Sequence, residues 1–256
     1  MNEGPFKVER SVLIHAKPST VFRYFTDSER FAAWWGKGST IEGRAGGAVR
    51  ICYPGGAIAG GQVVELVLNQ RIVFTYGYED ASKSIALDAS RVTISLEEER
   101  QGTRLSLVHE VADAKTKAEH DPGWRFQLSL FANVVAREAV GDPSALIDAF
   151  FAAWSEPNAD ALGAALARIV TDDVVFRDAF AALAGASDLA SHIRACQVFM
   201  PGVVLRRRGE PVACQGMILV DWDAGAAHGT NVFELAPDGR VARVTGFSRP
   251  ALRVSP

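Results

Sequence analysis

The sequence predicts an α+β protein of two domains, and three observations indicate this. Its 256 residues exceed the ~100–150 residues typical of one core. Strand patterns precede a long helix in the first half, whereas helical patterns precede strands in the second. In REAVGDPSALIDAFF, Gly141 ends one helical pattern, and Asp142 with Pro143 begins the next. The predicted domains are therefore residues 1–140 and 141–256.

The first half begins with a strand, FKVERSVLIHA, and two short helices. The first helix starts at Pro18; the second carries the adjacent Trp34 and Trp35 and stops at Gly36. Five β-rich segments follow: AVRICYP, QVVELVL, RIVFTYGY, RVTISLEEE and TRLSLVHEV. A helix from about Pro122 to Ala139 ends this half, with one apolar stripe formed by Trp124, Leu128, Phe131 and Val135. We expect a helix-grip fold, a curved antiparallel sheet around this long C-terminal helix.

The second half reverses this order. Its helical patterns are SALIDAFFAAW, NADALGAALARIV and SDLASHIRACQVF, with a short strand, VVFRDAF, before the third. Four strand-like segments end the chain: VVLRRRG, GMILVDW, GTNVFEL and RVARVTGF. We expect three helices packed against one face of a bent antiparallel sheet, which together form a cone with an open mouth.

The composition is that of a soluble globular protein, with 48% hydrophobic and 22% charged residues. No apolar run approaches the ~18 residues that span a bilayer, and the N-terminal MNEGPFKVER lacks the pattern of a secretory signal. Cys52, Cys196 and Cys214 are far apart, which argues against a disulfide framework and against a zinc site. We therefore expect a cytoplasmic protein that binds no membrane and no metal.

Nucleic acids and cofactors are not expected as partners. The net charge is −3, and the one basic cluster, Arg206–Arg208, fits a solvated edge strand. The glycine-rich GGAIAGG at 55–61 opens a strand rather than a helix and is followed by no lysine, so it is not a phosphate-binding loop.

Two superfamilies are similar to the two halves. IHAKPSTVFRYFTDSERFAAWW, QVVELVLNQRIVFTY and DPGWRFQLSLFANVV resemble the START/Bet v I-like (SRPBCC) superfamily, in the branch named after homologues of the activator of the 90-kDa heat-shock protein ATPase. FFAAW, DDVVFRD, AGASDLASHI, FMPG and GTNVFELAPDGRVARVTGF resemble the SnoaL-like, nuclear-transport-factor-2-like superfamily. The first resemblance covers about residues 6–139 and the second about 142–249. Both imply a fold with a cavity, and neither specifies an activity.

The adjacent tryptophans raise the question of what they face. Two neighbouring side chains on one short helix are not expected to point into the same core. The first resemblance implies that this helix lies across the mouth between the sheet and the long helix. We expect Trp35 to pack inwards and Trp34 to line the cavity or its rim, unless both seal one end of the sheet.

Other candidate ligand-binding residues of the first half lie on two strands and the long helix. Alternation places Phe74, Tyr76 and Tyr78 on one face as an aromatic wall, or as ordinary core. His109 shares an inward face with Leu105 and Leu107. We favour a buried histidine that is hydrogen-bonded to backbone or to a tyrosine over a catalytic base. Trp124, in the apolar stripe of the long helix, is also a candidate.

Candidate catalytic residues lie in the second half. The second resemblance implies carboxylates and histidines that project into the cone, and Asp178 and His192 match this as an acid/base pair. Asp178 is equally suited to cap a turn, and His192 to lie on an outer face. Asn231, where relatives carry a carboxylate, cannot act as a base. It is a candidate ligand-binding residue together with Trp154 and Trp222, and Phe199 is a further candidate for the apolar wall.

The leading hypothesis is a cofactor-free protein that binds a small hydrophobic or aromatic molecule in an apolar cavity of the first domain. One alternative is a cyclase, dehydratase or isomerase that acts through Asp178 and His192. A second alternative makes the C-terminal domain a dimerisation module, and we expect a homodimer. The co-chaperone activity in the first family's name is not expected, because in eukaryotes it also depends on a separate N-terminal domain.

Overall fold

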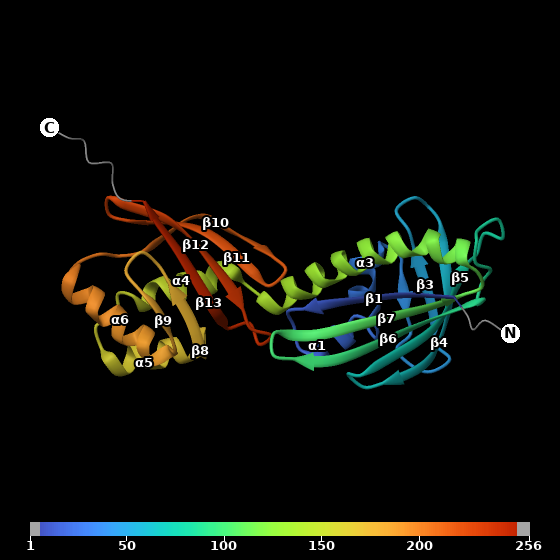
Figure 1. Ribbon diagram of the computed structural model, residues 1–256, viewed down its shortest axis with the longest axis horizontal. Helices are drawn as coiled ribbons and strands as arrows, with labels where there is room; N and C mark the ends of the chain where they lie inside the picture. Colours follow the sequence, from blue (N-terminus) through green and yellow to red (C-terminus); the bar gives the residue numbers. More distant parts are fainter. Residues whose placement is uncertain (1–5, 250–256) are drawn as a thin grey trace. The chain divides into compact units, whose positions relative to one another are not determined.

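The computed structural model describes residues 6–249 and confirms the predicted α+β fold class. The chain forms two compact units, Met1–Ala136 and Arg137–Pro256. Each unit has its own sheet (Figure 1). Within the described residues, no helix is both long enough and apolar enough to cross a membrane. Residues 1–5, on which the argument about a secretory signal partly depends, lie outside the described residues.

The sheet of the first unit has seven antiparallel strands in the order β1-β7-β6-β5-β4-β3-β2. The bounds are β1 (Phe6–Ile14), β2 (Thr40–Ile41), β3 (Ala48–Cys52), β4 (Ile58–Val67), β5 (Arg71–Tyr78), β6 (Ser90–Glu99) and β7 (Gly102–Val111). The first strand pairs with the last, Ile14 opposite Thr103. Inward-facing residues alternate along β6 and β7, as expected for a sheet with one buried face.

Three helices complete the first unit: α1 (Pro18–Arg23), α2 (Ser28–Trp35) and α3 (Ala114–Val140). Helix α3 runs along the sheet (Figure 1) and buries the predicted stripe of Trp124, Leu128, Phe131 and Val135. The predicted start of α3 at Pro122 is wrong, because Pro122 lies inside the helix. The side chain of Asp113 accepts a hydrogen bond from the backbone N–H of Thr116 at 2.8 Å and caps the helix eight residues earlier.

The second unit contains α4 (Pro143–Ala153), α5 (Ala159–Ile169) and α6 (Ala186–Phe199). Its sheet has the order β10-β11-β12-β13-β8-β9. The bounds are β8 (Val170–Arg177), β9 (Ala182–Ala184), β10 (Arg206–Cys214), β11 (Met217–Ala224), β12 (Ala227–Leu235) and β13 (Val241–Arg249). The core joins side chains from all three helices, such as Phe150, Leu162 and Ile193, to sheet residues such as Phe176 and Phe233.

One pair in the second sheet is parallel. Strand β13 runs parallel to β8, with Val244 opposite Phe176, whereas the other pairs are antiparallel. The prediction of an antiparallel sheet is wrong for this pair, because alternation along a strand does not reveal the direction of its partner. Short strand β9 was not predicted, because its three residues show no pattern.

Candidate functional site

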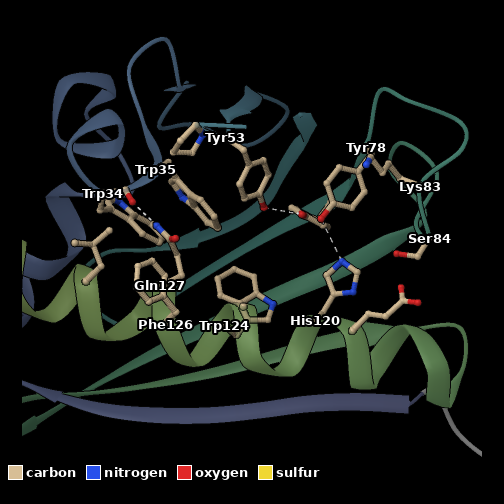
Figure 2. Close-up of a pocket in the computed structure, with 15 residues that line it drawn as sticks. Trp34, Trp35, Tyr53, Tyr78, Lys83, Ser84, His120, Trp124, Phe126 and Gln127 are labelled. Carbon is tan, nitrogen blue, oxygen red and sulfur yellow. Dashed lines mark hydrogen bonds between the residues drawn. The ribbon is translucent and has the colours of Figure 1, made fainter. Parts of the chain in front are cut away.

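A cavity of about 430 Å³ lies in the first unit between the sheet and α3 (Figure 2). One side is aromatic and apolar, and the other carries hydroxyl and imidazole groups. Its aromatic and polar lining includes Trp34, Trp35, Tyr53, Tyr76, Tyr78, His120, Trp124, Phe126 and Gln127. Lys83 and Glu119, both exposed, also line it. Two arrangements define the cavity chemically, a tryptophan cluster and a chain of polar groups.

Both tryptophans of α2 are buried, with 1% of Trp34 and 5% of Trp35 exposed. The expectation that they cannot both face the interior is therefore wrong. Their rings lie 4.5 Å apart, and each covers a different neighbour. Trp34 packs on Phe131 at 4.6 Å, and Trp35 packs edge-on against Trp124 at 5.6 Å. Helix α3 thus contacts both indoles, and both line the cavity.

The two indoles carry N–H groups that donate no hydrogen bond within the described part of the chain. The Nε1–H groups of Trp34 and Trp35 are buried without a hydrogen-bond partner there. The side chain of Gln127 donates instead to the backbone carbonyl of Trp34, which ties α3 to the end of α2 (Figure 2). Burying an indole N–H without an acceptor costs free energy, so packing of the rings must hold them in place.

A chain of polar groups forms the other wall. The hydroxyls of Tyr53 and Tyr76 lie 2.8 Å apart, and the Tyr78 hydroxyl lies 3.5 Å from Nε2 of His120 (Figure 2). Burial raises the pKa of both Tyr53 and Tyr76 well above the ordinary tyrosine value. These phenols therefore stay protonated and act as hydrogen-bond donors and acceptors rather than as bases.

His109 lies behind this wall and is fully buried. Its Nε2 is 2.8 Å from the Ser90 hydroxyl, and its Nδ1 accepts the indole N–H of Trp124 at 3.0 Å. Burial, with a smaller contribution from the neighbouring His120, lowers the pKa of His109 to about 3. The expectation of an inward-facing, hydrogen-bonded histidine is confirmed, although its partners are a serine and a tryptophan.

The structure brings some predicted residues together and leaves others apart. Trp34, Tyr76, Tyr78 and Trp124 line one cavity. Phe74 is fully buried in the core, and neither it nor His109 is among the described residues that line the cavity.

His120 and Tyr53 also line the cavity, and the sequence patterns did not indicate them. His120 is four residues before Trp124 and so lies on the same face of α3. That signal was hidden because the helix was expected to begin only at Pro122. Tyr53 follows β3 in a loop, where no periodicity indicates the direction of a side chain.

The second unit has its own cavity, of about 480 Å³. Its lining includes Trp154, Phe176, Asp178, Cys196, Trp222 and Asn231. The indole N–H of Trp222 donates to Oδ1 of Asn231 at 2.9 Å, which fixes the orientation of that buried amide. Phe199, a predicted wall residue, is 82% exposed and is not among the residues that line this cavity. It is the last residue of α6.

Asp178 and His192, the predicted acid/base pair, contact different groups. One carboxylate oxygen of Asp178 accepts from the backbone N–H groups of Phe180 and Ala181, both at 2.8 Å, as a turn cap does. The His192 ring packs edge-on against Trp154 at 5.8 Å, and its Nε2 lies 3.6 Å from the Cys196 sulfur. Within residues 6–249, neither a hydrogen bond nor an ion pair joins Asp178 to His192.

Residues 15–136 match the model of a family described as activator of Hsp90 ATPase homolog 1-like protein. This segment lies within the first unit. No curated protein matches the sequence.

Solved structures are similar to parts of the chain. Protein MLL2253 from Mesorhizobium loti is 18% identical, over 52% of this chain and 98% of that one, with a TM-score of 0.47. The Aha1 dimer from Colwellia psychrerythraea is 17% identical, over 48% and 90%, with a TM-score of 0.42. A putative isomerase of the SnoaL-like family from Agrobacterium tumefaciens strain C58 is 22% identical, over 41% and 95%, with a TM-score of 0.39. Each corresponds to about half of this chain or less.

Proposed function

We propose that the first unit binds a small aromatic or hydrophobic molecule in the cavity between its sheet and α3. The observation that carries the proposal is the set of indole rings at one wall, Trp34, Trp35 and Trp124. Indole faces provide apolar contact area and favour stacked or edge-on aromatic partners. A volume of about 430 Å³ lies within the range of pockets that hold small organic ligands.

The test introduces a larger side chain into the cavity and leaves the residues of the tryptophan cluster unchanged. Gly123 lines the cavity, and a Cβ added there meets nothing within 4 Å. Gly123→Leu should therefore place a side chain in the space of the ligand while the tryptophan cluster stays intact. We expect the full-length protein to bind 2-methoxynaphthalene, measured by isothermal titration calorimetry, and Gly123→Leu to weaken this binding at least about tenfold.

The matched control is Gly163→Leu, a similar substitution in a helix of the second unit. Gly163 is exposed, with nothing within 4 Å of an added Cβ, so this variant should bind the probe like the wild-type protein. A wild-type protein that takes up no probe, or equal affinities for wild type and Gly123→Leu, would contradict the proposal.

The catalytic alternative in the second unit, a cyclase, dehydratase or isomerase, has weaker support. Asp178 lines an apolar cavity with Asn231, as the hypothesis requires. One of its oxygens is already occupied by two backbone N–H groups, and His192 contacts Cys196 instead. These contacts argue against an acid/base pair of Asp178 and His192. Assignment of this unit to the SnoaL-like superfamily is likewise a proposal, supported by its three helices and bent sheet.

A dimeric assembly through the second unit is also a proposal. Val212 and Leu219 are directly opposite each other on β10 and β11, and both are exposed, with Met217 nearby. Apolar side chains that cluster on an exposed sheet face favour contact with a second copy of the chain.

A further inference from the structure

We infer that the ligand of the first unit is an aromatic molecule with a hydroxyl group, and that this hydroxyl binds between Tyr78 and His120. The inference rests on the proposed function and narrows the class of molecule that the cavity takes. It depends on three features: the tautomer of His120, the gap between His120 and Tyr78, and the charge of the surrounding groups.

The tautomer of His120 is set by its own helix. Its Nδ1 lies 2.9 Å from the backbone carbonyl oxygen of Thr116, one turn earlier in α3. A carbonyl can only accept, so Nδ1 carries the hydrogen. In the neutral ring, Nε2 is therefore an acceptor, and it lies on the cavity side, where the Tyr78 hydroxyl is its neighbour (Figure 2).

The gap between Nε2 of His120 and the Tyr78 hydroxyl is long. At 3.5 Å it is at the far limit of a hydrogen bond, whereas a well-formed O–H···N contact is several tenths of an ångström shorter. Nε2 of His120 is thus only weakly satisfied by this donor, and the Tyr78 hydroxyl also interacts with the hydroxyls of Tyr53 and Tyr76. A ligand atom that accepts from Tyr78 and also donates to His120 would satisfy both, and among neutral oxygen groups a hydroxyl does this with one oxygen.

The groups around His120 select a neutral ligand. Tyr53 and Tyr76 stay protonated because burial raises the pKa of both phenols. His109, whose ring centre is 5.6 Å from that of His120, is held neutral by burial. Lys83 and Glu119 carry opposite charges at exposed positions of the lining. A carboxylate or an ammonium would lose its hydration at this wall without gaining a buried counter-charge, which is costly.

The apolar wall fixes which end of the ligand reaches His120. The rings of Trp35 and Trp124 face the cavity from the side opposite Tyr78, and Phe126 extends that side (Figure 2). An aromatic body therefore has its contact area there, and its oxygen points to the polar chain. A flat molecule with one hydroxyl at its edge matches both walls.

The experiment compares two probes that differ in one methyl group. 2-Naphthol donates and accepts, whereas 2-methoxynaphthalene has the same ring system and can only accept. Calorimetry on the full-length protein at neutral pH should give about tenfold tighter binding for 2-naphthol, as expected for one hydrogen bond to a half-buried partner. His120→Phe should abolish the preference and leave the affinity for 2-methoxynaphthalene within about twofold. Tyr78→Phe should reduce the preference.

The matched control is His192→Phe, the same substitution beside the cavity of the second unit, which should keep the preference. Equal affinities of the wild-type protein for both probes would overturn this inference and leave the proposed function standing. Failure of both probes to bind would overturn both. A preference that persists in His120→Phe, or that disappears in His192→Phe, would overturn the assignment to this site. Where a variant does not fold, the wild-type comparison still tests whether the cavity prefers a ligand with a hydroxyl group.

Discussion

Two hydrogen bonds hold the neutral ring of His109 in one tautomer. The indole of Trp124 can only donate, so Nδ1 accepts, and Nε2–H donates to Ser90. The Ser90 hydroxyl in turn donates to the carbonyl of Tyr76 at 2.7 Å. Strands β5, β6 and β7 and helix α3 are thereby joined through one imidazole. Protonation of Nδ1 would break the bond to Trp124, which lines the cavity.

The stability of the protein should therefore depend on pH through His109. Its pKa falls from 6.5 to about 3 on burial, so the unfolded chain binds a proton in this window that the folded protein does not. Stability is then full above about pH 6.5 and decreases as the pH falls towards 3. We expect His109 alone to lower the free energy of unfolding by about 2 kcal/mol between roughly pH 8 and pH 5.

His109→Gln provides the control, because glutamine keeps an amide donor and acceptor but does not titrate. Urea unfolding of both proteins across this pH range should give a shallower pH dependence for the variant. The other histidines are common to both proteins, so their contributions cancel in the difference. Parallel pH dependences would contradict the assignment of His109 as a neutral, buried group.

At the scale of elements, the chain has two Asp-Pro dipeptides, and they take different positions in their helices. Asp142-Pro143 begins α4 as predicted, and Asp142 accepts from the backbone N–H groups of Ser144 and Ala145. Asp121-Pro122 shows the same signal inside α3, where Asp121 pairs with Arg10 of β1 instead. The local sequence does not distinguish these two dipeptides, because Arg10, the partner of Asp121, is more than a hundred residues distant along the chain. The longer strands and the helix stripes were predictable, since periodicity is a local property.

Glycine substitutions should have opposite effects in a strand and in a helix. A Cβ on Gly77 of β5 would come within 1.8 Å of the Ala86 carbonyl oxygen, a backbone atom that cannot move away alone. We expect Gly77→Ala to destabilise the protein by about 1–3 kcal/mol. Gly163 of α5 has open space around it, so Gly163→Ala should stabilise by about 0.5–1 kcal/mol through helix propensity.

Thermal and urea unfolding of both glycine variants measures these effects, with the wild-type protein as reference. An unchanged stability for Gly77→Ala would mean that the segment around Ala86 is not fixed against β5. A destabilised Gly163→Ala would mean that α5 makes a contact at this position in solution.

At the scale of the whole molecule, the two units have separate cores and separate cavities. The class of each unit followed from the order of its elements. Tyr76 and Tyr78 followed from alternation, Trp124 from helix spacing, and the position of Trp34 from the family resemblance. His120 could not be found in this way, because its place in the cavity depends on a helix start that the sequence obscures. The Asp178–His192 pairing came from a resemblance, and resemblance does not fix which atoms meet.

Separate cores predict that residues 1–140 fold alone. This fragment ends where α3 ends. We expect it to unfold cooperatively, to bind 2-methoxynaphthalene with the affinity of the full-length protein within about threefold, and to be monomeric in analytical ultracentrifugation. A dimeric full-length protein beside a monomeric fragment would support assembly through the second unit. A fragment that is unfolded, or that dimerises, would contradict this division of roles.

The strand order of the first unit has a consequence during synthesis. Strand β1 pairs with β7, so Ile14 has no partner until Thr103 has left the ribosome. At ordinary translation speeds this delay is on the order of 5–20 seconds. During that time the nascent chain exposes an unpaired strand edge, which chaperones at the tunnel exit can shield. The last wall of the cavity, α3, emerges later still, so the nascent chain can bind a ligand only after the sheet is complete.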